Sequence, residues 1–214
     1  MRLIIHLGLV SCLLLGVAAQ AHVPYFERRD FTESRPLVIP KEVEQSIAVY
    51  AWLRWGQDGV STDVDPYRFE LIGPTSIYAE LLVPVCEAYR DYAPWLALVG
   101  PGLPPPPTGL VLPFEVPLGE GVLIAADPYQ PGDLRETFFE PFGNKSYYIG
   151  PELTEMLVQP GVYRLQVWDP EGIGGDYVAV IGDQEIWERD DILRGLLLTP
   201  AIRQGRELHV DCPQ

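Results

Sequence analysis

The sequence predicts an all-β fold, an antiparallel β-sandwich with one or two short helices near the C-terminus. Proline (22 residues) and glycine (20 residues) are spread along the 214 positions as turn signals. Between them lie short runs rich in Val, Ile, Tyr, Phe and Trp, which are the residues that strands favour. In the runs 67–71 and 163–167, apolar and polar side chains alternate, as they do in a strand with one buried face.

Seven runs are predicted to form strands of this sandwich. In chain order they are 46–55, 67–71, 77–85, 96–99, 121–126, 163–167 and 177–181. Because alternate side chains of a strand point to the same face, we expect two packed sheets with a shared core. The side chains expected to face inward are Tyr67, Phe69, Leu71, Tyr163, Leu165 and Val167.

Two short segments are predicted to be helical. Segment 151–156 begins with proline, which suits the first position of a single helical turn. Segment 192–198 follows Asp190 and Asp191, either of which can cap a helix. Pro200 is expected to end this second helix.

The first 21 residues are typical of a secretory signal peptide. Arg2 gives the segment a positive start, and residues 3–19 are almost wholly apolar. Ala19-Gln20-Ala21 then fits the small-residue pattern of a cleavage site. A secreted or periplasmic location follows from this pattern.

Cleavage is expected just before His22. Residues 22–214 would then form one β-sandwich domain with an extended N-terminal arm and a C-terminal helix and tail, and no membrane span. The competing interpretation is a lipoprotein anchored at Cys12, but the apolar run continues past this cysteine.

The charge of the chain limits its partners. It carries 30 Asp and Glu against 15 Lys and Arg, which gives a formal net charge of −15. Such a surface repels nucleic acid, and no basic patch is evident in the sequence. An extracellular protein or glycan partner is left open.

The cysteines predict a disulfide. Cys86 and Cys212 are the two that follow the predicted signal peptide. An even pair in an oxidising compartment normally bonds. Two buried free thiols are the alternative.

Two segments carry a family resemblance. Segment 63–69 (DVDPYRF) resembles the D-x-D-x-Y-x-F start of a strand in bacterial pre-peptidase C-terminal (PPC-like) domains. Segment 160–168 (PGVYRLQVW), followed by Gly175-Asp176-Tyr177, resembles their closing hairpin. The resemblance implies a jelly-roll-like β-sandwich accessory module without catalysis of its own, and some such domains bind calcium. The chain is longer than a typical module.

Catalytic motifs are absent from the sequence. Only His22 and His209 follow the predicted signal peptide, which limits general acid–base and zinc chemistry. There is no H-E-x-x-H, nucleophile elbow, P-loop or dinucleotide fingerprint. We therefore predict a non-catalytic binding or scaffold protein, and a glycan-active hydrolase with paired carboxylates is a third hypothesis.

Two Gly-rich loops carry clustered carboxylates that suggest calcium. One loop holds Asp58, Asp63 and Asp65, and the other holds Asp169, Glu171 and Asp176. Calcium takes six to eight oxygen ligands, so neighbouring loops could share one ion. The candidate ligands are Asp63, Asp65, Asp169 and Asp176. The alternative is that these aspartates are only turn residues.

A copper site is the second functional hypothesis. If cleavage exposes His22, its α-amine and ring nitrogen can chelate one metal, with His209 as a second imidazole and Asp211 as an oxygen ligand. His209 and Asp211 would share one side of a strand. This set resembles the N-terminal histidine brace of exported copper-binding β-sandwich proteins and of lytic polysaccharide monooxygenases. The alternative is that signal peptidase simply tolerates His22.

Overall fold

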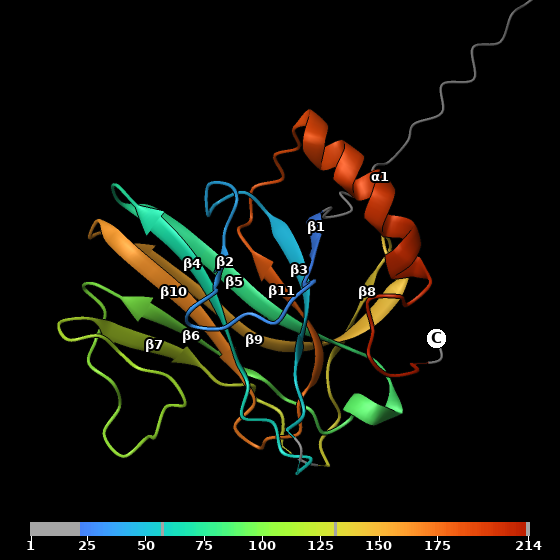
Figure 1. Cartoon of the computed structure of the whole chain (residues 1–214), viewed down its shortest axis with the longest axis horizontal. Helices are drawn as coiled ribbons and strands as arrows, with labels where there is room; N and C mark the ends of the chain where they lie inside the picture. The colour runs from blue at the N-terminus through green and yellow to red at the C-terminus, as the bar shows by residue number, and fades with distance from the viewer. Residues whose placement is uncertain (1–21, 57, 131, 213–214) are drawn as a thin grey trace, which may run out of the picture.

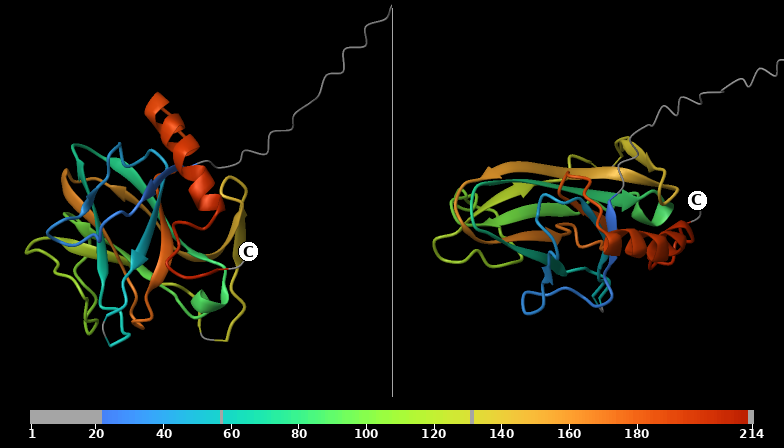
Figure 2. Two further views of the ribbon diagram at one scale, coloured as in Figure 1. Left: turned by 45° about the vertical axis from the view of Figure 1, so that its right-hand side comes forward. Right: turned by 90° about the horizontal axis from the view of Figure 1, so that it is seen from above.

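The computed structural model describes residues 22–56, 58–130 and 132–212, so the predicted signal peptide lies outside the described residues. Two β-sheets pack face to face, and one C-terminal α-helix lies beside strand β1 (Figure 1). The view from above in Figure 2 shows the two sheets as layers, with the helix at one end. The predicted all-β sandwich is confirmed.

The first sheet has six strands in the order β1-β3-β11-β5-β9-β8. Its strands are β1 (Val23–Phe26), β3 (Ile47–Leu53), β5 (Thr75–Pro84), β8 (Thr137–Glu140), β9 (Lys145–Leu157) and β11 (Gly175–Ile181). The pairing of β1 with β3 is parallel, and the other pairs in this sheet are antiparallel.

The second sheet has five strands in the order β2-β4-β10-β6-β7. Its strands are β2 (Leu37–Val38), β4 (Val64–Leu71), β6 (Trp95–Gly100), β7 (Gly121–Ala125) and β10 (Gly161–Trp168). Here β2 pairs with β4 in parallel, and the remaining pairs are antiparallel. The N-terminal arm thus crosses from one sheet to the other, since it supplies both β1 and β2.

The core forms where the alternation of the sequence predicted it. All six side chains expected to face inward are buried, namely Tyr67, Phe69, Leu71, Tyr163, Leu165 and Val167. Strand β4 pairs with β10 so that Phe69 lies opposite Tyr163, and their rings stack with centroids 5.7 Å apart. The two alternating segments therefore build one continuous apolar face.

The helix predicted at 151–156 is wrong, because this segment belongs to strand β9 and pairs with β5. Its buried side chains Pro151, Leu153 and Leu157 recur with the period of a strand. The register of β5 against β9 shifts between Glu80 and Leu82. This irregularity lies opposite the proline, which has no N–H to donate to a regular ladder.

The C-terminal helix was predicted correctly in position but not in extent. Helix α1 spans Arg189–Arg203, and a 3-10 turn, η1, spans Glu87–Tyr89. The expected cap at Asp190 or Asp191 is wrong, because both lie inside the first turn and Glu188 is the N-cap residue. Glu188 forms a capping box with Asp191, whose carboxylate accepts the Glu188 backbone N–H at 3.0 Å. Pro200 lies inside α1 instead of ending it. None of the described helices is long and apolar enough to cross a membrane.

The C-terminal tail is fastened to the sandwich covalently. Cys86 and Cys212 form the expected disulfide, with Cα atoms 5.2 Å apart and a sequence separation of 126. The bond joins the tail to the start of η1. The tail therefore runs back over the sheet that contains β3 and β11.

Replacing Phe69 should test the core. Phe69→Ala removes a buried ring that stacks on Tyr163, so the free energy of unfolding should fall by roughly 3–5 kcal/mol. Phe139 is 56% exposed, and Phe139→Ala should change the free energy by less than about 1 kcal/mol. Urea denaturation of both variants is the measurement. Equal losses in the two variants would contradict this packing.

Candidate metal centre

Four carboxylates from two separate segments meet at one end of the sandwich. Glu27 directly follows β1, and Asp30 lies further along the N-terminal arm. Asp63 precedes β4, and Asp65 belongs to it. These four residues are called the acidic cluster below. One oxygen each of Glu27, Asp30 and Asp65 lie within 4.8 Å of one another.

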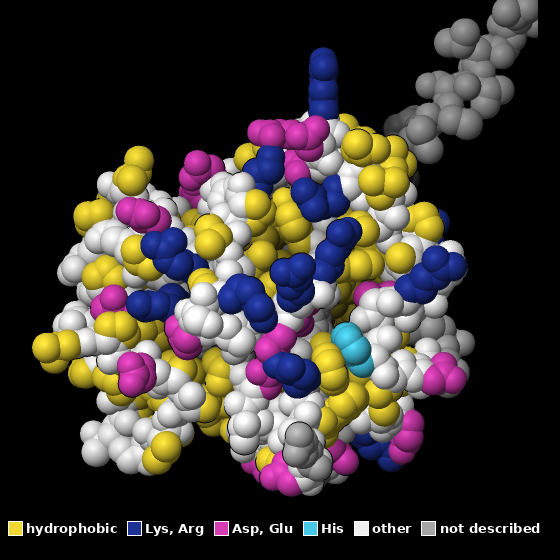
Figure 3. Space-filling model, viewed as in Figure 1, with side chains coloured by type: hydrophobic (Ala, Val, Ile, Leu, Met, Phe, Trp, Pro, Cys, Tyr) yellow, Lys and Arg dark blue, Asp and Glu magenta, His cyan; other side chains and the backbone are white. Residues whose placement is uncertain are grey.

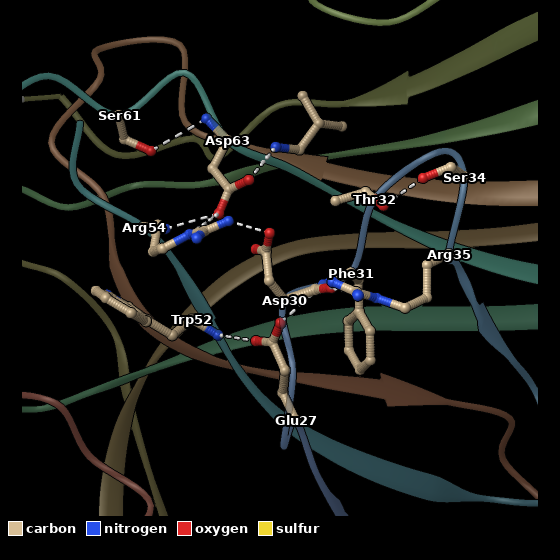
Figure 4. Close-up of polar contacts among 11 residues, drawn as sticks. Glu27, Asp30, Phe31, Thr32, Ser34, Arg35, Trp52, Arg54, Ser61 and Asp63 are labelled. Carbon is tan, nitrogen blue, oxygen red and sulfur yellow. Dashed lines mark hydrogen bonds and ion pairs between the residues drawn. The ribbon is translucent and has the colours of Figure 1, made fainter. Parts of the chain in front are cut away.

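Glu27 fixes the arm in place. Strand β1 ends at Phe26, where parallel pairing with β3 also ends. Beyond that point the Glu27 carboxylate accepts the backbone N–H of Trp52 at 2.9 Å and that of Phe31 at 3.0 Å. The side chain thus continues the hydrogen bonding of β3 and closes a turn of the arm. Both contacts appear in Figure 4.

Asp65 is the most deeply buried member of the acidic cluster. Its exposed fraction is 0%, as the alternation of β4 requires. The Tyr177 hydroxyl donates to its Oδ2 at 2.6 Å, and the hydroxyls of Tyr177 and Tyr67 lie 2.7 Å apart. The other oxygen, Oδ1, is buried and has no hydrogen-bond partner among the described residues. A buried carboxylate normally has both oxygens satisfied.

Burial makes negative charge costly in the acidic cluster. It raises the pKa of Glu27 from an ordinary 4.5 to about 7, although two backbone N–H groups act in the opposite direction. Burial also raises the pKa of Asp65 well above its usual range, and the charge of Glu27 adds to this. The carboxylates therefore need either protons or a cation.

One basic side chain already borders the acidic cluster. The Arg54 guanidinium forms an ion pair with Asp30 and lies 4.0 Å from a carboxylate oxygen of Asp63. Figure 4 shows Arg54 between these two aspartates, with Glu27 on the far side of Asp30. Arg54 does not pair with Glu27 or Asp65. The inner half of the cluster has no basic partner among the described residues.

The donor atoms indicate which metal would fit. Every candidate ligand in the acidic cluster is a carboxylate oxygen, without imidazole or thiolate. Hard cations such as calcium and magnesium prefer oxygen, while zinc and copper prefer nitrogen or sulfur. Three carboxylates can supply up to six oxygens to calcium if each binds through both.

Of the four predicted calcium ligands, two lie in the acidic cluster and two lie elsewhere. Asp63 and Asp65 belong to the acidic cluster, whereas Asp169 and Asp176 do not. Asp169 accepts the N–H groups of Glu171 at 3.0 Å and Gly174 at 2.9 Å, which is the role of a turn residue. Asp58 does the same for Val60 in the other loop.

Asp176 is occupied by a different set of contacts. Its carboxylate accepts the Tyr89 hydroxyl at 2.6 Å and the His209 backbone N–H at 2.7 Å. It also contacts Nδ1 of the His209 ring at 2.6 Å. Asp176 therefore holds the C-terminal tail against β11 and does not face the acidic cluster.

The residues of the copper hypothesis lie apart from one another. The His22 ring contacts the Ser46 hydroxyl, just before β3, while the His209 ring stacks on Trp52 near the far end of β3. Trp52 lies six positions after Ser46 along an extended chain, which is roughly 20 Å. The expected strand through His209 and Asp211 is wrong, because the His209 N–H is bound by Asp176 instead of a neighbouring strand.

Glu27 and Asp30 were not predicted from the sequence. They lie in a segment without strand alternation and more than 30 residues from Asp63. The parallel pairing of β1 with β3 places Glu27 against the backbone of Trp52. Arg54, two residues on, contacts both Asp30 and Asp63. The available signal was the pair Asp63 and Asp65 at the start of β4, and it identified two of the four residues of the acidic cluster.

No protein-family model and no curated protein matches the chain. Among solved structures, it is similar to the pre-peptidase C-terminal domain of a collagenase from Bacillus anthracis, with 14% sequence identity and a TM-score of 0.31. The match covers 73% of this chain and 98% of that one. This likeness assigns no role to the acidic cluster.

The raised pKa of Glu27 predicts how the free energy of unfolding of the metal-free protein depends on pH. Between pH 4.5 and about 7, the folded protein keeps a proton on Glu27 that the unfolded chain loses. The free energy of unfolding should therefore decrease as pH rises through this range, by roughly 1–2 kcal/mol after allowance for partial exposure.

Melting temperatures in EDTA from pH 5 to pH 8 measure this dependence. Glu27→Gln removes the titrating group, so the variant should show a flatter profile than the unaltered protein. Parallel profiles for the two proteins would show that Glu27 does not titrate in this range.

Proposed function

We propose that this chain is a secreted or periplasmic, non-catalytic binding module whose β-sandwich is stabilised by calcium at Glu27, Asp30 and Asp65. The observation that carries the proposal is the free Oδ1 of Asp65, which is buried beside two other carboxylates. A cation at this point would satisfy that oxygen and offset the repulsion among the three side chains.

The ion would connect parts of the chain that are distant in sequence. Glu27 and Asp30 belong to the arm, while Asp65 belongs to β4 of the opposite sheet. An ion bound by all three would fasten the arm across the end of the sandwich. Asp63 and Arg54 would flank the ion as an outer pair, since the Arg54 backbone N–H already binds Asp63 at 2.8 Å.

An extracellular or periplasmic setting supports calcium over other hard cations. Residues 1–21 have the pattern of a signal peptide, and the Cys86–Cys212 disulfide is typical of an oxidising compartment. Calcium modules outside the cell commonly bind at about 10⁻⁴ to 10⁻³ M, which matches the calcium concentration there. A site built from three carboxylates fits this range.

Calcium should raise the melting temperature of EDTA-treated protein at pH 8. A concentration 100 times the dissociation constant stabilises by about 2.7 kcal/mol, which is roughly 5–10 °C for a chain of this size. Asp65→Asn and Asp30→Asn should each lose most of this rise. The matched control is Asp169→Asn, which removes a carboxylate from a turn and should keep the full rise.

Two results would reject the site. One is an unchanged melting temperature of the unaltered protein at 10 mM calcium. The other is a rise of equal size in Asp65→Asn, Asp30→Asn and Asp169→Asn, which would indicate unspecific binding to an acidic surface.

A further inference from the structure

A hollow of about 230 Å³ opens beside the acidic cluster. Glu27 and Asp30 form part of its wall, and Arg28, Arg29, Trp52 and His209 line it as well. Figure 3 shows Lys and Arg side chains gathered across this face of an otherwise acidic protein. The hollow therefore combines the proposed metal ligands, basic groups and aromatic rings.

Two of its arginines are free. Arg28 and Arg29 are exposed and form no ion pair or hydrogen bond with any described residue. Their neighbours are engaged, since Arg54 pairs with Asp30 and Arg35 donates to the Asp30 carbonyl. Free guanidinium groups at the edge of a hollow can bind a carboxylate through two parallel hydrogen bonds.

The aromatic wall is held rigidly. The Trp52 and His209 rings stack with centroids 4.0 Å apart, and Trp55 meets Trp52 edge-on at 5.3 Å. Asp176 fixes the His209 ring through Nδ1, so its unpartnered Nε2 is left for other contacts. The His209 side chain is 45% exposed and lines the hollow, with Trp52 stacked behind it. An exposed aromatic ring of this kind provides apolar contact area for the flat face of a sugar ring.

The proposed ion would also take part. Calcium binds six to eight oxygens, and the two oxygens of Glu27 already accept backbone N–H groups. Three carboxylates used in this way leave coordination positions for oxygens from outside the protein. Glu27 and Asp30 belong both to the acidic cluster and to the wall of the hollow, so an ion held by them would border the hollow.

We propose that this hollow binds a carboxylate-bearing sugar, a uronic acid unit of an acidic polysaccharide. The sugar carboxylate would contact Arg28 and Arg29 and complete the coordination of calcium, while the sugar ring would pack on the His209 ring that is stacked on Trp52. This inference rests on the proposed calcium site. A sugar is favoured over an acidic peptide because the hollow offers a rigid aromatic wall beside its charges.

Calorimetric titration with trigalacturonate tests the inference. Binding should be measurable in 5 mM calcium and at least about tenfold weaker in EDTA, since the ligand loses a direct metal contact. The methyl ester of the same trisaccharide keeps the sugar rings but not the charge. It should also bind at least about tenfold more weakly.

The variant Arg28→Ala with Arg29→Ala should weaken trigalacturonate binding by about tenfold or more while leaving the calcium-induced rise in melting temperature unchanged. The control Arg90→Ala with Arg189→Ala removes the same charge from exposed positions outside the hollow and should bind normally.

The outcomes separate this inference from the calcium proposal. If calcium raises the melting temperature but trigalacturonate does not bind, the sugar site is wrong and the calcium site stands. Equal binding of the methyl ester, or of a glutamate trimer, would also overturn the sugar site. If calcium has no effect on either measurement, both proposals fail.

Discussion

The burial of Asp65 is the constraint on which this end of the molecule depends. Strand β4 places the carboxylate in the core with only one oxygen bonded, next to Glu27 and Asp30 of the N-terminal arm. A buried carboxylate without a partner costs several kcal/mol, and neighbouring negative charges increase this cost. Protons on the acidic cluster can reduce the repulsion at low pH, and a cation can do so at neutral pH. The stability of the arm is therefore linked to whatever neutralises the cluster.

The same arrangement connects stability with recognition. The Glu27 carboxylate accepts the backbone N–H groups of Phe31 and Trp52. It therefore fixes both the arm and the backbone from which the Trp52 side chain extends. Arg28 and Arg29 directly follow Glu27 in the sequence, so the contacts of Glu27 also determine that these two residues lie at the hollow. A cation that secures the arm would thus also fix the two free guanidinium groups. Calcium would contribute to sugar binding in two ways. It would coordinate the sugar carboxylate directly, and it would hold the arm that carries the two arginines.

The sequence was most informative where structure is local. Alternation around Phe69 and Tyr163 identified the core faces, since a period of two needs only neighbouring residues. Pro151 was misread as a helix start because a proline in a central strand is rare, and only pairing across an irregularity explains it.

Asp63 and Asp65 were found from their spacing, but Glu27 and Asp30 reach them through long-range parallel pairing. Asp176 looked like a ligand because composition does not show that His209 and Tyr89 already occupy its carboxylate.

A crystal structure of the protein grown in millimolar calcium, with an anomalous difference map, is the most direct measurement of the central claim. The account predicts one peak bound by oxygens of Glu27, Asp30 and Asp65 at about 2.3–2.6 Å. Arg54 should still pair with Asp30 or Asp63 at the outer edge. A well-ordered map with no peak among these three carboxylates, or with the peak at the turn held by Asp169, would contradict it.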